Sequence, residues 1–147
     1  MMSFLTTALG PSPELFRAGA ILVNKEGKHF TDGYGALAQE TAKQTAAMAF
    51  ILFDHSLAYK LHDYPNIIST APGIAYAYLN DYRRNRRDIF HTAPTLDQLA
   101  ACIRVPAKEL ATTIVAHNKV RGDRQRINQP NFYALGPVKA YVVFTDG

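Results

Sequence analysis

Apolar residues along this chain occur in short continuous runs and in one helical repeat, and these patterns predict most of its elements. Residues 48–53 form a continuous apolar run that is closed by Asp54, which is typical of a strand buried on both faces. Residues 20–24 and 28–32 are two further extended runs on either side of a tight loop. They predict a β-hairpin in which Gly27 supplies a positive φ.

The clearest helical signal begins at Thr95. Thr95 and Gln98 have the spacing of a capping box, in which two side chains satisfy free backbone N–H groups at the start of a helix. Four apolar residues then recur on one helical face: Leu96, Leu99, Ala100 and Ile103. Pro106 is predicted to open a second helix at the position where its missing N–H costs nothing. Leu110 and Ile114 continue an apolar face along that helix.

The remaining elements follow from composition and from the Pro and Gly residues that interrupt them. Helices are predicted over residues 36–47, 55–62 and 74–85. Residues 88–93 predict a short strand, and the apolar stretch 131–147 predicts another. Strands and helices follow each other irregularly, so the predicted class is α+β. We expect a single compact domain with a small mixed sheet, an N-terminal β-hairpin and several short helices.

Length and composition suit one domain with its own core. The chain has 147 residues, of which 48% are hydrophobic, and this is enough to bury a sizeable apolar interior. Only 19% are charged, which fits a domain that hides part of its surface against a partner. The formal net charge is +4. No run of about eighteen apolar residues is present, so no membrane-spanning helix is predicted.

Cys102 is the single cysteine of the chain, which excludes an internal disulfide. It lies within a helical pattern among apolar neighbours, so we predict a buried and unreactive thiol. This usage of cysteine suits a reducing compartment, and we expect a cytoplasmic protein.

A glycine pattern follows the predicted hairpin. Residues 33–38 fit G-x-G-x-x-[GA], and Asp54 follows at about the distance expected of a dinucleotide-binding turn. The strand before such a turn should be apolar, whereas residues 28–32 are half polar. We therefore interpret the pattern as a sharp glycine turn, with the dinucleotide fingerprint as the alternative.

The densest charge on the chain is the basic segment 83–87, which contains four arginines. With tyrosines nearby, it is the basis of an alternative function, a module that binds nucleic acid or another anionic partner. Asp81 and Asp88 flank it, and charge runs commonly face water, so we interpret it as a solvated face or a domain interface. Arg17, next to the first predicted strand, is a candidate carboxylate clamp. The histidines lack metal-ligand spacing, and no metal site is predicted.

Several motifs, in order, resemble the fumarate reductase/succinate dehydrogenase-type FAD-dependent flavoproteins, a family that includes ketosteroid-dehydrogenase-like members. Residues 19–32 are similar to its G-A-I-L-V-N-x-x-G-x-R-F segment, and residues 50–54 to its strand that ends in Asp. Residues 95–118 resemble its helices T-L-x-E-L-A and V-P-x-x-x-L-x-x-T-V-x-x-Y-N. Residues 131–137 resemble P-F-Y-A-x-x-x-P, and 145–147 resemble the start of T-x-G-G.

The resemblance implies that residues 1–147 are the capping, or substrate, domain of a larger flavoprotein, and the strand-like end of the chain also suggests a piece of a longer protein. In this family the cap closes over flavin and substrate and excludes water from hydride transfer. The implied reaction is dehydrogenation or reduction of a carbon–carbon bond next to a carbonyl. The implied partners are the FAD-binding domain of the parent and a small-molecule substrate. FAD is expected in the parent and not in this piece alone, which we expect to be inactive and to bind neither membrane nor nucleic acid.

The fumarate-type catalytic residues do not carry over from the resemblance. The family's arginine general acid would lie around Leu37, and residues 33–40 contain no basic residue. The histidine before T-x-G-G is replaced by Val143 and Phe144, so the resemblance implies a less charged substrate, as in the ketosteroid-dehydrogenase-like branch. No catalytic residue is assigned. The candidates for facing flavin or substrate are Thr145, Asp146, Gly147, Arg17, Gly33, Tyr34 and Gly35.

Overall fold

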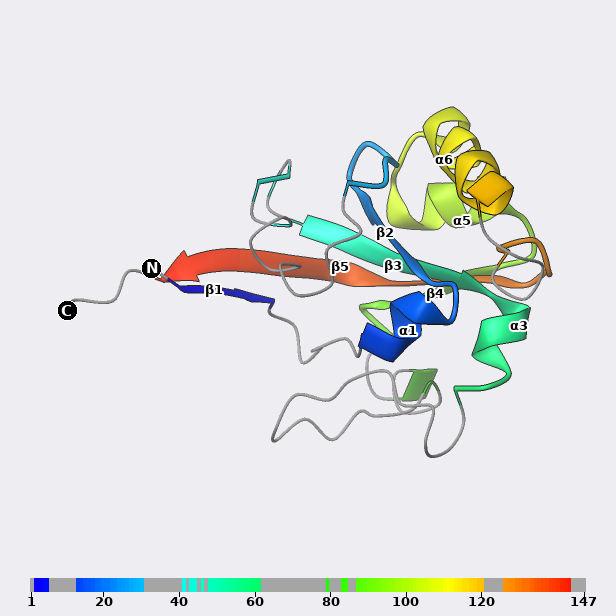
Figure 1. Ribbon diagram of the computed structural model, residues 1–147, viewed down its shortest axis with the longest axis horizontal. Helices are drawn as coiled ribbons and strands as arrows, with labels where there is room; N and C mark the ends of the chain where they lie inside the picture. The colour runs from blue at the N-terminus through cyan, green and yellow to red at the C-terminus, as the bar shows by residue number, and fades with distance from the viewer. Residues whose placement is uncertain are drawn as a thin grey trace.

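The computed structural model describes residues 2–5, 13–30, 41, 43–44, 46, 48–61, 79, 83–84, 87–120 and 126–143. Within these residues, a five-stranded sheet lies between two layers of helices (Figure 1). The α+β class is therefore confirmed. Every pairing between the described strands is antiparallel, so this part of the sheet is antiparallel and not mixed.

The sheet is organised around its last strand. Its strands are β1 (Met2–Leu5), β2 (Ile21–Asn24), β3 (Met48–Asp54), β4 (Phe90–Ala93) and β5 (Phe132–Val143). β3 lies between β2 and β5. The other edge of β5 pairs with β4 along its first residues and with β1 along its last. One long strand therefore joins three others, including the N-terminal one.

The helices cover both faces of this sheet. They are α1 (Pro13–Arg17), α3 (His55–Ala58), α5 (Leu96–Ile103) and α6 (Ala107–Val120). In Figure 1, α5 and α6 lie above the sheet, whereas α1 and α3 lie below it. Side chains of β3 alternate between the two layers: Ile51 and Phe53 join the α1 side, and Phe50 and Leu52 join the α5 side. The prediction of a strand buried on both faces is confirmed.

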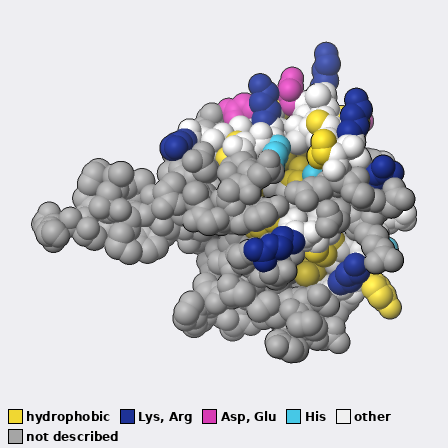
Figure 2. Space-filling view, in the orientation of Figure 1, with side chains coloured by type: hydrophobic (Ala, Val, Ile, Leu, Met, Phe, Trp, Pro, Cys, Tyr) yellow, Lys and Arg dark blue, Asp and Glu magenta, His cyan; other side chains and the backbone are white. Residues whose placement is uncertain are grey.

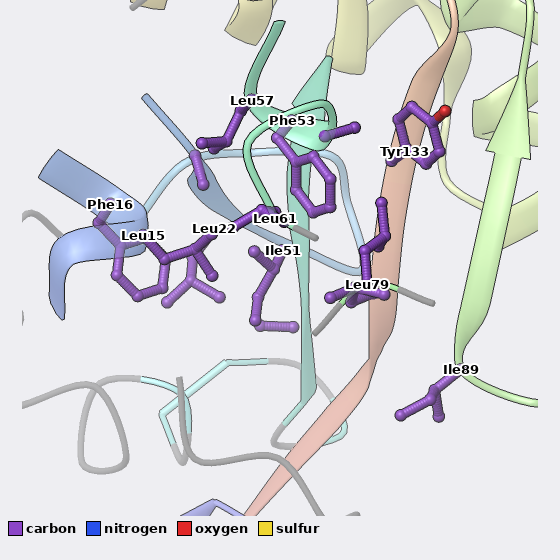
Figure 3. Packing of buried hydrophobic residues seen from close by; sticks show 14 residues of the cluster. Leu15, Phe16, Leu22, Ile51, Phe53, Leu57, Leu61, Leu79, Ile89 and Tyr133 are labelled. Atoms are coloured by element: carbon purple, nitrogen blue, oxygen red, sulfur yellow. The ribbon is translucent and has the colours of Figure 1, made fainter. Parts of the chain in front are cut away.

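The core on the α1 side brings together residues that are distant in sequence, as Figure 3 shows. Leu15 and Phe16 of α1 point toward Leu22 of β2. At the other end of the cluster, the rings of Phe53 and Tyr133 stack with centroids 5.5 Å apart. Each fully buried side chain of this size contributes about 1.5–3 kcal/mol of transfer free energy, so this cluster fixes the helices to the sheet.

The predicted N-cap role of Thr95 on α5 is confirmed. The Oγ1 atom of Thr95 accepts a hydrogen bond from the N–H of Gln98 at 3.1 Å. The predicted apolar face is buried at Leu99, Ala100 and Ile103. On α6, the N–H of Leu110 donates to the carbonyl of Pro106 at 3.0 Å. Because that carbonyl accepts the first helical bond, Pro106 is the residue before the helix and not its first residue.

The thiol of Cys102 is exposed, so the prediction that it is buried was wrong. Successive residues of a helix are about 100° apart around its axis. That rotation places Cys102 about 110° from the middle of the buried face of α5. Ala100 and Ile103 therefore point into the core, whereas Ala101 and Cys102 are exposed.

Other elements are shorter than predicted. The second strand of the hairpin is reduced to one bridge, between Val23 and His29, and α3 ends at Ala58 with a turn after it. Residues 43–44 form a turn and a bend, and Ala46 has a left-handed φ of 59°. A helix over 36–47 therefore does not reach its predicted end, because this φ lies outside the helical region. Residues 64–73, and most of 74–85, lie outside the described residues.

Residues 126–130 are held against the domain and are called here the strap. Asn118 of α6 pairs with Ile127 in both directions: its Oδ1 accepts from the Ile127 N–H at 2.8 Å, and its Nδ2 donates to the Ile127 carbonyl at 3.1 Å. The side chain of Ile127 is buried in the core on the α5 side. The strap is therefore part of the fold, although its sequence is largely polar.

Candidate functional site

Six of the seven residues proposed from the sequence to face flavin or substrate, at positions 33–35 and 145–147, lie outside the described residues. The seventh, Arg17, is the last residue of α1 and is exposed. A tight turn follows it, closed by a hydrogen bond from the Gly19 N–H to the Phe16 carbonyl at 3.1 Å. This turn leads directly into β2 and fixes where the backbone of Arg17 lies. Its role as a carboxylate clamp stays a prediction.

The predicted hairpin turn is confirmed, and Asn24 organises it. The Oδ1 atom of Asn24 accepts hydrogen bonds from the N–H groups of Glu26 at 3.0 Å and Lys28 at 2.9 Å. Its Nδ2 atom donates to Oε1 of Gln44 at 3.0 Å. Asn side chains commonly close turns in this way because they mimic a backbone group. Asn24 is 8% exposed, so these bonds are formed in a largely dry environment.

The same turn packs against α6. Gly27 has a φ of +79°, and a Cβ atom on it would lie 3.1 Å from the backbone nitrogen of Leu110. The hydroxyl of Thr113 donates to the Gly27 carbonyl. These contacts fix the hairpin tip, and with it the backbone of Lys25, over the α5 side of the sheet.

Replacing Asn24 with alanine is expected to lower the free energy of unfolding by about 2 kcal/mol, because two part-buried N–H groups of the turn lose their acceptor. The matched variant Asn24→Asp keeps the oxygen that accepts both hydrogen bonds and loses the donation to Gln44, so we expect about half that cost. Urea denaturation followed by circular dichroism measures both. An Asn24→Asp variant as unstable as Asn24→Ala would contradict the assignment of Oδ1 as the main contributor.

A pocket of about 250 Å³ opens beside this hairpin on the α5 side. Its apolar lining comes from β3, the end of α5 and β5, and its polar lining comes from the hairpin, from β4 and the turn before it, and from the end of α5. The lining residues are Lys25, Met48, Phe50, Asp88, His91, Cys102, Ile103, Arg104 and Pro137. Strand pairing and the turn at Asn24 therefore bring together residues that lie more than a hundred positions apart in the sequence.

Two polar lining residues are held in place by the backbone. Arg104 caps the C-terminus of α5 with left-handed backbone angles, φ 59° and ψ 42°. His91 on β4 has its Nε2 atom 2.9 Å from the carbonyl of Gly136. Because a carbonyl only accepts, Nε2 carries the hydrogen, and Nδ1 of the neutral ring is the acceptor. None of these residues was proposed as a site from the sequence. The signal that could have indicated Arg104 is its position directly after a helical repeat.

Asp54 is occupied by the fold itself. Its Oδ1 accepts from the N–H of Ser56 at 3.0 Å and of Leu57 at 3.5 Å. Its Oδ2 accepts from the N–H of Asn128 at 2.9 Å and of Gln129 at 2.8 Å. The carboxylate is 2% exposed. It therefore serves as the N-cap of α3 and as the anchor of the strap.

The described residues do not fit a dinucleotide-binding site for FAD. Such a site needs a parallel strand, a glycine turn and an acidic side chain that is available to the ribose. Here the described strand pairs are antiparallel, and both oxygens of Asp54 already accept backbone hydrogen bonds. This supports our interpretation of the glycine pattern, whose residues 33–38 lie outside the described part of the chain.

The described arginines of the basic segment are exposed: Arg83, Arg84 and Arg87. The guanidinium carbon of Arg83 lies 5.2 Å from the ring centroid of Phe90, within the range of a cation–π contact. On the face in Figure 2, Lys and Arg side chains lie at several separate places among other atoms. Among the described residues on this face, the arrangement fits a solvated surface better than a continuous track for a nucleic-acid backbone.

We expect the chain to bind single-stranded DNA or RNA no more tightly than nonspecific contact, with a Kd no tighter than about 10⁻⁶ M at physiological salt. Fluorescence anisotropy of a labelled oligonucleotide, measured at two salt concentrations, checks this. Tight binding that is lost on changing Arg83, Arg84 and Arg87 to glutamine would contradict the prediction and favour the alternative function.

No group of three or more His, Cys, Asp or Glu side chains in the described part is arranged to hold a metal ion. No helix among the residues described above is long and apolar enough to cross a membrane.

Comparisons with known proteins reveal the same fold in parts of larger enzymes. No protein-family model matches the sequence, and no match to a curated protein was found. The chain superposes on the open conformation of a flavocytochrome c3 fumarate reductase with a TM-score of 0.61 and 18% identity, covering 95% of this chain and 25% of that one. It superposes on 3-ketosteroid-Δ4-(5α)-dehydrogenase from Rhodococcus jostii RHA1 with a TM-score of 0.60 and 19% identity, covering 95% of this chain and 29% of that one.

A third match has nearly the same span as this chain. It is the solution NMR structure of a fumarate reductase flavoprotein subunit from Lactobacillus plantarum, with a TM-score of 0.57 and 20% identity. The superposition covers 89% of this chain and 88% of that one. The chain thus spans about a quarter of the two enzymes above and most of this third structure. At these identities, the likeness establishes a shared fold.

Proposed function

We propose that this chain is the capping domain of an FAD-dependent oxidoreductase of the fumarate reductase/succinate dehydrogenase type. One observation carries the proposal: 95% of the chain has the fold of a segment within a fumarate reductase and within a ketosteroid dehydrogenase. The order of motifs along the sequence points to the same family. FAD would be held by a neighbouring domain of the parent, because the described residues here offer no dinucleotide site.

The physical role that fits this domain is to cover the reaction and keep it dry. Buried clusters on both faces fix the helices to the sheet, and we propose that the domain moves as one body over a flavin and a substrate. Excluding water strengthens the electrostatic interactions inside a closed site and prevents side reactions. The flavin supplies the hydride chemistry, and the cap contributes substrate placement.

The proposed substrate class is a small molecule with a carbon–carbon bond next to a carbonyl, which the parent dehydrogenates or reduces. The fumarate-type arginine and histidine have no counterpart around Leu37 or at Val143 and Phe144. We therefore propose a substrate that is less charged than fumarate. The fold likeness to a ketosteroid dehydrogenase is compatible with such a substrate.

The proposal is tested by expressing the continuous reading frame that contains this chain and comparing it with the chain alone. We expect the longer product to purify with bound flavin and the 147-residue chain to purify without it. Deleting residues 13–143 from the longer product should preserve flavin binding and abolish turnover of apolar enones. A longer product without flavin, or a flavin-bound isolated chain, would refute the proposal. Turnover of fumarate but not of apolar enones would refute the substrate class alone.

The fold of the isolated chain can be tested separately. The match of nearly equal span was determined in solution, which supports independent folding of a domain of this size. We expect the chain to unfold cooperatively on its own.

A further inference from the structure

We propose that the pocket beside the hairpin binds a small amphipathic carboxylate, with its apolar body on the floor and its charge between Lys25 and Arg104. This inference goes beyond the proposed function, since it concerns a site made by this chain's own residues and needs no flavin. At about 250 Å³, the pocket lies just below the range of about 300–1,000 Å³ that is usual for small-ligand sites.

The floor of the pocket is apolar and belongs to the rigid part of the fold. Phe50 is 3% exposed and Ile103 is 6% exposed, and both are part of the core on the α5 side. Met48 packs against the same cluster from the start of β3, and Pro137 lines the pocket from β5. A thioether and a proline ring beside an aromatic edge form a surface that adapts to a flat or branched apolar group.

The polar side of the pocket carries an excess of positive charge. Lys25 and Arg104 are permanently charged near neutral pH, and Asp88 opposes them with one carboxylate. Among the described residues, no ion pair joins Lys25 or Arg104 to an acidic side chain. A carboxylate placed there would form charge-assisted hydrogen bonds, and an arginine fork matches its geometry.

The backbone positions from which both cations extend are fixed. Lys25 lies in the turn that Asn24 closes with two hydrogen bonds, and Arg104 is the C-cap residue of α5. The carbonyls of Ala100 and Ala101 at that helix end already accept from backbone N–H groups, which reduces their repulsion of an anion. Preorganised groups lose less entropy on binding, which favours affinity.

The single thiol of the chain supplies a direct readout. Cys102 is exposed and lines the pocket, so a bound ligand should shield it from alkylation by iodoacetamide. The extent of alkylation is measured from the mass of the intact protein. The probe is 4-phenylbutyrate, compared with its uncharged amide and with inorganic phosphate. We expect 4-phenylbutyrate to slow alkylation saturably with a Kd of about 1 mM, given the size of the ligand. The amide should bind about tenfold more weakly, and phosphate should give no protection.

Single substitutions test whether Lys25 and Arg104 themselves bind the carboxylate or whether the overall positive charge of the chain is enough. Lys25→Gln and Arg104→Gln should each raise the Kd for 4-phenylbutyrate about tenfold. The alkylation rate of each variant with ligand is compared with its own rate without ligand. Arg104→Gly removes the same charge and suits the left-handed backbone at this position, so it tests the idea even where the glutamine variant does not fold. Lys119→Gln, an exposed cation of α6 that does not line the pocket, should leave the Kd within about twofold.

Three results would overturn the proposal. The first is equal protection by the amide, which would remove the role of charge. The second is unchanged binding in Lys25→Gln and in both Arg104 variants. The third is the absence of protection by 4-phenylbutyrate at concentrations well above about 1 mM.

Discussion

The variant Gly136→Ala is expected to lose about 4 kcal/mol of unfolding free energy, near the upper end of what single substitutions cost. Gly136 has a φ of +153°, and a Cβ atom on it would lie 2.7 Å from Cδ1 of Phe50 and 2.9 Å from the carbonyl oxygen of Ala49. The pairing of β3 with β5 shifts register at this point, between Ala49 and Ile51. Gly136 and Pro137 thus lie opposite Phe50 in a bulge that only a residue without a side chain can form.

Thermal and urea denaturation measure this loss, and Gly27→Ala is the matched control. Gly27 also has a positive φ, but its nearest contact would be the nitrogen of Leu110 at 3.1 Å, so we expect about 1–2 kcal/mol there. In a double-mutant cycle, Phe50→Ala should recover at least about 1 kcal/mol of the Gly136→Ala cost by removing one of the two close contacts. Equal costs for the two glycine variants, or strict additivity with Phe50→Ala, would contradict a steric origin.

The variant Asp54→Ala is expected to cost about 3 kcal/mol, because it removes the acceptor of four backbone N–H groups at once. Two of these groups begin α3, and the other two belong to the strap, at Asn128 and Gln129. We therefore expect more than a loss of global stability. Amide hydrogen exchange in the strap should accelerate in this variant more than exchange in β2.

Comparison with Asp54→Asn shows how much of this cost depends on the acceptor oxygens of Asp54. The asparagine side chain keeps one oxygen that can accept from α3 or from the strap, but its NH₂ group faces the N–H donors of the other segment. We therefore expect about half the loss of unfolding free energy that Asp54→Ala causes. Asp97, an exposed acidic residue in the first turn of α5, is the control for charge alone, and its replacement by alanine should cost about 0.5 kcal/mol. If Asp54→Ala lowers the free energy of unfolding no more than Asp97→Ala does, then Asp54 does not anchor both α3 and the strap.

The elements that could be predicted are those whose signal is local. The apolar run of β3, the cap at Thr95 and the repeat after it each depend on neighbours within a few positions, and each is confirmed. The hairpin turn was predicted from Gly27. Its actual organiser, Asn24, could have been found from the preference of Asn for such turns. For Cys102, counting helical angles would have given the observed exposure, whereas its apolar neighbours in sequence were misleading.

The features that were not predicted depend on partners far away in the chain. The sequence indicates Asp54 as the end of the apolar run and as the acidic residue of the glycine pattern, but not as an anchor for the strap, because its acceptance from Asn128 spans 74 positions. The pocket likewise joins Lys25 to Arg104 through packing that no local pattern encodes. The bulge at Gly136 depends on its position opposite Phe50, which is fixed only once β3 and β5 are paired. Most of the residues proposed to face flavin or substrate lie outside the described part, and their roles stay predictions.

The central place of β5 has a consequence for synthesis of the protein. β3 is the most continuously apolar strand, yet its longest pairing is with β5, which leaves the ribosome after some eighty further residues have been translated. Until then the nascent chain carries an apolar strand with one unpaired edge, and non-local pairing of this kind is slow to form. The growing polypeptide should therefore depend on chaperones during this interval, and release from them should coincide with the emergence of the last strand.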